Sequence, residues 1–228
     1  MNLKAKLLKK TTVSNYSSRN SSVYDDPMNK NFVYGKMTID FVNRIKLQKT
    51  DEIIADIGCG TGFALDIMYD RIKKNNSKCF GIEPAKGMLK LAKEKFKSDK
   101  NFSFSEGTFA KTPLKDKYAD KIISTLALHW VPSLDDAILE LKRILKPKGS
   151  INILMIAKDD GEGFKQPIIR AMKNHLSFKQ IMKAAMLAQR VSSKQIFKYF
   201  EKKFNLKDEY NLVVQNINKT IYGSFDEH

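Results

Sequence analysis

The sequence of 228 residues has 41 Lys and Arg residues against 25 Asp and Glu, a formal net charge of +16, and a hydrophobic content of 42%. This length and composition suit one globular domain, and no apolar run approaches the roughly 20 residues of a membrane-spanning helix. Cys59 and Cys79 are too few for a disulfide framework and lack metal-ligand spacing, so we expect no metal site and a reducing, cytoplasmic setting.

The positive charge comes almost entirely from lysine, because the sequence contains only six arginines. A charge of this size is typical of nucleic-acid-binding proteins. However, recognition of phosphates and bases favours the forked donors of arginine, and the lysines are scattered along the chain. Nucleic acid is therefore an alternative partner rather than the favoured one.

Residues 1–28 are predicted to form a flexible basic segment that precedes a single domain at 29–228. Met1–Tyr24 contains no acidic residue and no apolar core of a secretory signal. An organellar transit peptide is the alternative interpretation, which makes an organelle the alternative location.

From Asn29 to Ile45, apolar residues recur at helical spacing, and short apolar runs then alternate with amphipathic stretches. The predicted strands are Glu52–Ile57, Lys78–Ile82, Asn101–Ser105, Lys121–Thr125 and Ser150–Ile156. The predicted helices between them are Gly62–Lys74, Met88–Phe96 and Leu134–Leu145, the last of which ends at Pro147–Gly149. This alternation predicts an α/β fold, Rossmann-like and doubly wound, with a mostly parallel sheet and helices on both faces.

After Lys158 the alternation stops. Asp159–Gly163 is predicted to be an acidic loop, and Pro167–Arg190 and Ser192–Phe204 are predicted helices. Together they predict a helical cap at about 164–204, and Tyr210–Tyr222 is expected to be a late strand.

A glycine-rich turn follows the first predicted strand, in Asp56-Ile57-Gly58-Cys59-Gly60-Thr61-Gly62. Its glycines permit positive φ angles and a close approach of backbone to ligand. Phe63 occupies the position where a dinucleotide site requires its last glycine, which argues against NAD. Asp56, at the strand end, suits the ammonium of a bound amino acid, directly or through water, better than a pyrophosphate.

Glu83 ends the second strand, about 20 residues beyond the glycine turn, where an acid accepts hydrogen bonds from ribose hydroxyls. One ligand with a free ammonium at one end and an unphosphorylated ribose at the other satisfies both acids. That ligand is S-adenosyl-L-methionine, whose product after methyl transfer is S-adenosyl-L-homocysteine.

The stretch from about Tyr24 to Ala157 resembles the class I S-adenosylmethionine-dependent methyltransferases. The resemblance implies that Asp56 and the glycine turn contact the methionine part, that Glu83 contacts the ribose, and that Gly107–Phe109 faces the adenine. Thr108 stands where many relatives carry an acid, so the contact to the adenine amino group stays open. The full set implied for the cofactor is Asp56, Gly58, Cys59, Gly60, Gly62, Glu83, Pro84, Met88, Gly107, Thr108, Phe109 and Leu126.

Leu126–Val131 and Ile144–Gly149 resemble the carboxyl O-methyltransferases that act on malonyl-carrier protein, trans-aconitate and juvenile hormone acid. This neighbourhood also includes a complex I assembly factor that hydroxylates an arginine. The resemblance implies an enzyme that methylates a small-molecule or acyl-carrier-bound oxygen, with a carboxylate favoured. The alternatives are an RNA methyltransferase and a non-methylating assembly factor or hydroxylase.

His129 follows the fourth predicted strand, at the edge where this architecture binds ligands, and is the candidate catalytic residue. It would serve as a general base toward a hydroxyl or amine, but would only orient a carboxylate, which is already ionised. Trp130, Tyr24 and Tyr34 are further candidates for substrate binding. The alternative for each is a structural role, in the core or in a loose N-terminal arm.

The resemblance also implies a final antiparallel strand, for which the sequence after Tyr210–Tyr222 leaves little room. Three explanations are open: the final strand is lacking, the late strand at Tyr210–Tyr222 is wrongly placed, or this sequence is a truncated form of the protein. A missing strand would leave an open sheet edge that favours association, and the oligomeric state is left open.

Overall fold

The computed structural model describes residues 33–158, 170, 175–181, 190–204, 210–215 and 217. The predicted basic segment 1–28, Tyr24, the acidic loop 159–163 and most of the helix predicted at 167–190 lie outside these residues. In the described part of the chain, no helix is long and apolar enough to cross a membrane.

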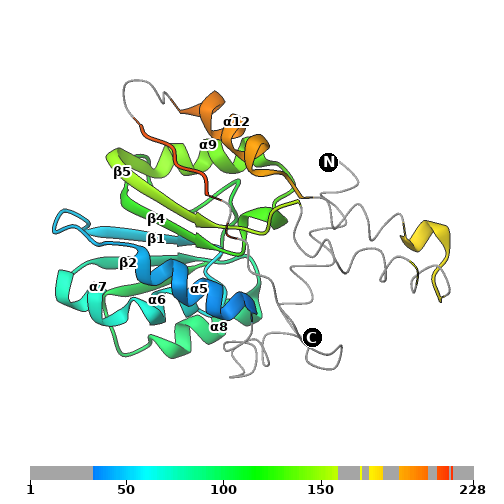
Figure 1. Ribbon diagram of the computed structural model, residues 1–228. Helices are drawn as coiled ribbons and strands as arrows, with labels where there is room; N and C mark the ends of the chain where they lie inside the picture. Colours follow the sequence, from blue (N-terminus) through cyan, green and yellow to red (C-terminus); the bar gives the residue numbers. More distant parts are fainter. Residues whose placement is uncertain are drawn as a thin grey trace.

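Five parallel strands form one sheet in the order β3-β2-β1-β4-β5 (Figure 1). The strands are β1 Ile53–Ile57, β2 Lys78–Ile82, β3 Phe102–Ser105, β4 Ala119–Thr125 and β5 Leu145–Leu154. The strand order reverses between β1 and β4, and ligands of such sheets bind outside the carboxyl ends of the strands at this switch point. The predicted α/β, doubly wound, parallel architecture is confirmed.

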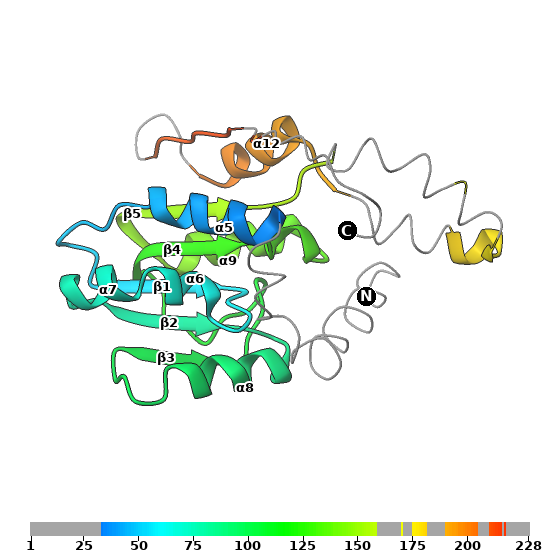
Figure 2. The same ribbon diagram turned by 60° about the horizontal axis from the view of Figure 1, so that its bottom comes forward.

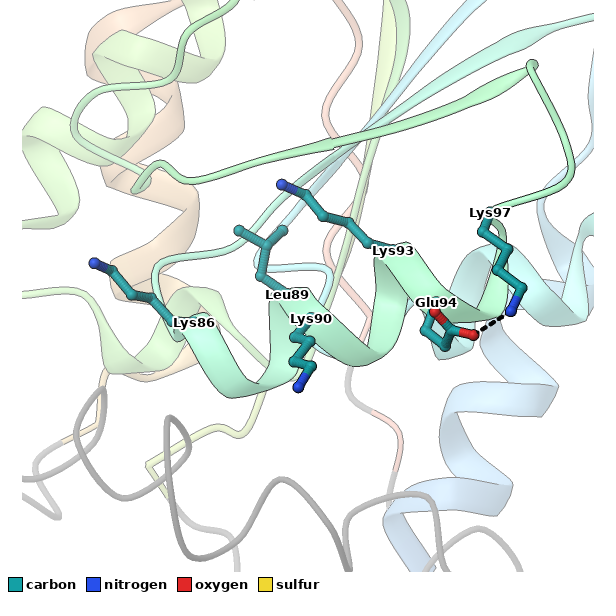
Figure 3. A pocket seen from close by; sticks show the side chains of 6 residues that line it. All are labelled: Lys86, Leu89, Lys90, Lys93, Glu94 and Lys97. Carbon is teal, nitrogen blue, oxygen red and sulfur yellow. Dashed lines mark hydrogen bonds and ion pairs between the residues drawn. The ribbon is translucent and has the colours of Figure 1, made fainter.

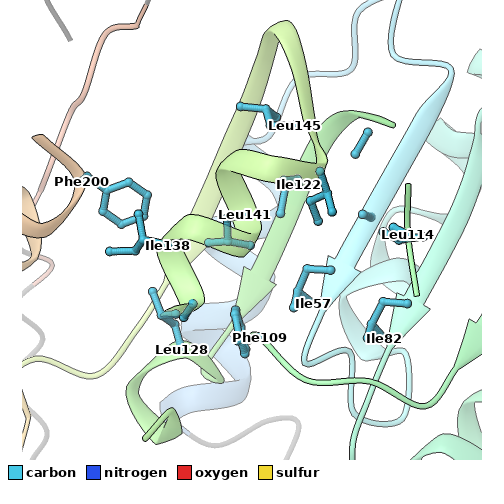
Figure 4. Packing of buried hydrophobic residues seen from close by; sticks show 14 of the residues in the cluster. Ile57, Ile82, Phe109, Leu114, Ile122, Leu128, Ile138, Leu141, Leu145 and Phe200 are labelled. Carbon is cyan, nitrogen blue, oxygen red and sulfur yellow. The ribbon is translucent and has the colours of Figure 1, made fainter. Parts of the chain in front are cut away.

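Helices cover both faces of the sheet (Figures 1 and 2). One face packs against α5 to α8 through a cluster that includes Val42, Leu65 and Leu89. The other face packs against α9 and, beyond it, α12, whose Phe200 adjoins Ile138 and Leu141 in Figure 4. The helices are α5 Val33–Arg44, α6 Phe63–Ile67, α7 Tyr69–Asn75, α8 Lys86–Lys95, α9 Leu134–Ile144 and α12 Ser193–Lys203, with a short 3-10 helix, η2, at Leu128–Trp130.

The helix predicted at Gly62–Lys74 is interrupted at one residue, Met68, where φ is −89° and ψ is −2°. Backbone hydrogen bonds continue on both sides, from the Met68 N–H to the Ala64 carbonyl (3.2 Å) and from the Ile72 N–H to the Met68 carbonyl (2.9 Å). Met68 is fully buried, so the break lies on the side of the helix that faces the core.

The predicted start and end of the last sheet strand, Ser150–Ile156, are wrong. β5 begins at Leu145, directly after α9, and ends at Leu154. The pairing with β4 moves from Ala119↔Leu145 to Lys121↔Ser150, so the predicted Pro147–Gly149 turn exists as a bulge inside the strand, with Lys148 at a φ of 64°.

The described part of the predicted late strand, residues 210–215 and 217, forms no strand. Its alternating apolar residues have another cause. Tyr210 packs edge-on against Phe204 with ring centroids 5.0 Å apart, and Leu212 packs on the same cluster. These two side chains thus pack against the core cluster that includes Phe204 instead of extending the sheet. The end of that predicted strand, and any strand after it, lie outside the described residues.

Candidate functional site

The glycine turn after β1 is fastened to the end of β2. The N–H groups of Gly58 and Cys59 both donate to the Ile82 carbonyl, at 2.8 and 3.2 Å. Gly58, Gly60 and Gly62 all have positive φ, between 56° and 79°. A Cβ on Gly58 would come within 2.4 Å of the Ala127 Cβ, so glycine is required there both for its conformation and for the close approach of the loop after β4.

Asp56, at the end of β1, is fully buried. Neither of its carboxylate oxygens has a hydrogen-bond partner among the residues that the structure describes. Burial, together with the nearby Glu83, raises the pKa of Asp56 to about 8. An acid in this state favours a ligand that brings a cation or hydrogen-bond donors, because an unpaired buried polar group is costly.

Glu83 connects the glycine turn to the start of α8. Its Oε2 accepts from the Gly60 N–H at 3.0 Å, and its Oε1 accepts from the Ala85 N–H at 2.9 Å. Burial raises the pKa of Glu83, and the two backbone hydrogen bonds oppose that rise. The side chain is thereby held in one orientation beside the turn.

The remaining residues expected at the cofactor surround this turn. The Met88 Cε lies 3.4 Å from the position that a Gly60 Cβ would take, and a ring atom of Phe109 lies 3.2 Å from that of Gly58. Leu126, after β4, has a φ of 54°, and its N–H donates to the Leu154 carbonyl at 2.8 Å. Residues from β1, β2, α8 and the loops after β3 and β4 therefore converge on the glycine turn.

Three other expected residues lie on or beside the same loops. Pro84 is half-buried between Glu83 and Ala85, and Gly107 approaches Ile82. Thr108 is exposed at a turn closed by two backbone hydrogen bonds with Lys111, of 3.0 and 3.1 Å. Thr108 is therefore an exposed residue of this loop, whereas the neighbouring Phe109 is buried beside Gly58.

His129 lies in η2, beyond the end of β4, and is 8% exposed. Its Nδ1 accepts from the Ile156 N–H at 3.4 Å, whereas its Nε2 has no hydrogen-bond partner in the described part of the chain. Burial, and secondly the charge of Arg190, lower the pKa of His129 to about 3. His129 is therefore neutral at neutral pH, with its proton on Nε2.

Trp130 contacts Arg190, a residue for which the sequence predicts no role in the site. The Arg190 Cζ lies 4.4 Å from the centre of the Trp130 ring, and the His129 and Trp130 rings lie 5.1 Å apart. One signal could have identified Arg190, because an arginine is informative in a chain that takes nearly all its positive charge from lysine. Tyr34, in the first turn of α5, is 41% exposed, and Tyr24 lies outside the described residues.

A separate hollow of about 430 Å³ lies along α8 (Figure 3). All six of its lining residues belong to α8 and the turn after it, and none belongs to the glycine turn: Lys86, Leu89, Lys90, Lys93, Glu94 and Lys97. It is therefore a basic surface feature distinct from the site described above. Among the described residues, no group of three or more His, Cys, Asp or Glu is placed to hold a metal ion.

The sequence and the fold of this chain are similar to those of known methyltransferases. Residues 55–153 match the family model described as a methyltransferase domain. A malonyl-[acyl-carrier protein] O-methyltransferase of Marinomonas sp. (strain MWYL1) is 35% identical over 101 residues, which cover 44% of this chain and 36% of that protein. The ubiquinone/menaquinone biosynthesis C-methyltransferase UbiE of Campylobacter jejuni (strain 81-176) is 34% identical over 119 residues, 51% of this chain and 49% of that protein.

The chain therefore spans between about a third and a half of the length of these two relatives. Among solved structures, the phosphoethanolamine N-methyltransferase 2 of Haemonchus contortus in complex with S-adenosyl-L-methionine superimposes with a TM-score of 0.65. The match covers 89% of this chain and 44% of that chain at 18% identity. At this identity the likeness concerns the fold.

Proposed function

Because residues 55–153 match a methyltransferase domain, we propose that this chain belongs to the class I S-adenosylmethionine-dependent methyltransferase superfamily, binds S-adenosyl-L-methionine at the glycine turn and methylates an acceptor. The observation that carries the proposal is the state of Asp56. Its buried carboxylate, without a partner in the described residues, has the chemistry to receive the ammonium of an amino-acid ligand.

The donor set fits the rest of the cofactor. Each carboxylate oxygen of Glu83 accepts one backbone N–H and keeps a second lone pair, so both can also accept from ribose hydroxyls. Met88 supplies apolar surface next to Gly60, and Phe109 supplies it next to Gly58. The positive φ of Gly58 and Gly60 brings the backbone close enough to contact a ligand directly.

The bound cofactor would supply an electrophilic methyl group on a sulfonium. The contribution of this chain is to orient the acceptor and exclude water, and near-attack positioning can lower a barrier by roughly 7–11 kcal/mol. His129 suits orientation better than proton removal, because its Nδ1 already accepts the Ile156 N–H and its pKa is lowered to about 3.

The properties of His129 favour a carboxylate oxygen as the acceptor. The relatives are named as an O-methyltransferase of a malonyl-carrier protein and a C-methyltransferase. Methylation of carbon, a hydroxyl or an amine requires removal of a proton, for which a neutral side chain with a pKa near 3 is a poor base. An ionised carboxylate, on a small molecule or on an acyl carrier, requires none.

Mass spectrometry tests the reaction directly. The wild-type protein is incubated with S-adenosyl-L-methionine and a panel of free carboxylic acids, malonyl thioesters and hydroxylated or aromatic analogues. The proposal expects a methylated carboxylate that is absent with Asp56→Ala but present with Glu52→Ala, whose exposed side chain precedes β1 and serves as the control. Modification of carbon acceptors alone, or a hydroxylated product in place of a methylated one, would exclude carboxyl methylation.

RNA methylation is the second candidate, and one surface observation favours it. Lys86, Lys90 and Lys93 are exposed along α8, and Lys97 is exposed in the turn after it. If RNA binds through this face, its affinity falls as salt rises, and replacing a phosphate-binding lysine by glutamine reduces the salt slope by about one. We expect that Lys→Gln variants of these four residues leave the salt dependence of RNA affinity unchanged. A reduced salt slope in these variants would instead support RNA as the substrate.

A further inference from the structure

Three side chains beyond the carboxyl ends of β4 and β5 have no role in the proposed cofactor site: His129, Trp130 and Arg190. The neutral His129 ring receives the Ile156 N–H on Nδ1, so its other nitrogen carries the hydrogen. That Nε2–H donor is buried, in a residue only 8% exposed, and it lacks an acceptor among the described residues. A buried donor of this kind calls for a hydrogen-bond acceptor, which a ligand can supply where the described residues do not.

Arg190 brings a positive charge to the same place. Its guanidinium stacks on the Trp130 ring, at 4.4 Å, and its charge acts on His129. Stacking engages the face of the guanidinium, whereas its five N–H donors lie in its plane and can serve more than one acceptor. The segment that carries Arg190 is tied to the chain beyond β5, because the Lys158 N–H donates to the Val191 carbonyl at 3.1 Å.

We propose that His129, Trp130 and Arg190 form an anion-binding subsite for the carboxylate of the methyl acceptor, and that Arg190 determines the preference for that acceptor. The inference rests on the proposed function and names its substrate class. The Nε2–H of His129 and the guanidinium of Arg190 would each donate to the carboxylate, and Trp130 fixes the plane of the guanidinium.

In the reaction, a lone pair on one carboxylate oxygen of the acceptor would form the new O–CH₃ bond. The S–CH₃ bond of S-adenosyl-L-methionine would break, and its electron pair would go to the sulfur. No proton is transferred, so His129 keeps its Nε2 hydrogen throughout. The product is a neutral ester, which loses the charge that Arg190 recognises. The subsite therefore discriminates substrate from product, and its weak hold on the ester assists release.

The single tryptophan of this chain makes the test direct, because Trp130 lies within the subsite. The fluorescence of the full chain is titrated with malonyl-N-acetylcysteamine, which has a free carboxylate, and with its methyl ester. We expect saturable binding of the acid and at least about tenfold weaker binding of the ester, the effect of losing one charge-assisted interaction. Inorganic phosphate, titrated in parallel, is expected to bind more weakly than the acid.

Variants assign the effect to Arg190. Arg190→Gln is expected to weaken binding of the acid at least about tenfold, Arg190→Lys to restore part of it, and Arg44→Gln, at an exposed site on α5, to change nothing. Circular dichroism shows whether each variant is folded. If Arg190→Gln does not fold, the Arg190→Lys variant, which keeps the positive charge, is compared with wild type instead.

Equal binding of acid and ester overturns the inference, as does tighter binding of phosphate, or no saturable change up to about 10 mM of the acid. Calorimetric titration of the same proteins with S-adenosyl-L-methionine separates the two proposals. If the cofactor binds normally to wild type and Arg190→Gln while the acid and the ester are indistinguishable, the subsite fails and the proposed function stands. If the cofactor does not bind to wild type, the proposed function fails whatever the fluorescence shows.

Discussion

Replacing Asp56 by asparagine is expected to stabilise the ligand-free protein increasingly as the pH rises. Asp56 is fully buried, and burial with the nearby Glu83 raises its pKa from 3.8 to about 8. Between pH 3.8 and about pH 8, the folded protein retains the Asp56 carboxyl proton that the unfolded chain has released. The free energy of unfolding therefore falls as the pH rises through this window, and it stays lowered above pH 8.

The magnitude follows from the two pKa values. One pKa unit corresponds to about 1.4 kcal/mol, so a carboxyl held near 8 instead of 3.8 opposes folding by roughly 6 kcal/mol at high pH. Asparagine has nearly the same shape and no ionisable proton. The difference in stability between Asp56→Asn and wild type is thus expected to grow by about 1.4 kcal/mol per pH unit between about pH 5 and pH 8.

Urea unfolding followed by circular dichroism at a series of pH values measures this difference. Asp70→Asn, at an exposed acid on α7, is the matched control for the same chemical change at the surface. A stability difference between Asp56→Asn and wild type that is independent of pH would refute the assignment of a raised pKa to Asp56.

Three further substitutions test other parts of the structure. Gly58→Ala places a Cβ 2.4 Å from the Ala127 Cβ at a φ of 74°, so urea unfolding should show a loss of roughly 2–4 kcal/mol; unchanged stability would mean that the turn relaxes freely. The Lys121 ammonium lies 3.3 Å from the Asp51 carboxylate, and both side chains are buried, so Lys121→Met leaves a buried acid without its cation. Thermal unfolding should show a loss of about 3–5 kcal/mol of stability, part of which is restored when Asp51→Asn is added. Losses from the two substitutions that simply add would contradict the pairing. Ser192→Ala removes the side-chain cap of α12 and should cost about 1 kcal/mol by the same method, with no loss as the contrary result.

The parts of the fold that depend on local pattern could be predicted from the sequence. The strand at Lys78–Ile82 was predicted with its observed limits, and the strand leading to Asp56 was predicted to within one residue. Their carboxyl ends meet in a parallel sheet, so the proximity of Asp56, Glu83 and the glycine turn followed from topology alone. The helix at Leu134–Leu145 was predicted equally well, because its apolar residues recur on one face.

The failures have a common physical origin in tertiary packing. The alternation at Tyr210 and Leu212 is that of a strand, yet these side chains pack on the core cluster that includes Phe204 without joining the sheet. Pro147 and Gly149 are typical of a turn between elements, whereas the sheet accommodates them as a bulge. The stacking of Arg190 on Trp130 joins residues 60 positions apart, and no local pattern encodes such a pair.

The most direct test of the central claim is a calorimetric titration with S-adenosyl-L-methionine on wild type, Asp56→Asn and Glu83→Gln, with Glu52→Gln as the exposed control. Wild type and the control are expected to bind one equivalent with the same affinity. Each site variant should bind at least about tenfold more weakly, a loss of about 1.4 kcal/mol or more. Binding by both site variants as tight as that of wild type would contradict a cofactor site built on Asp56 and Glu83.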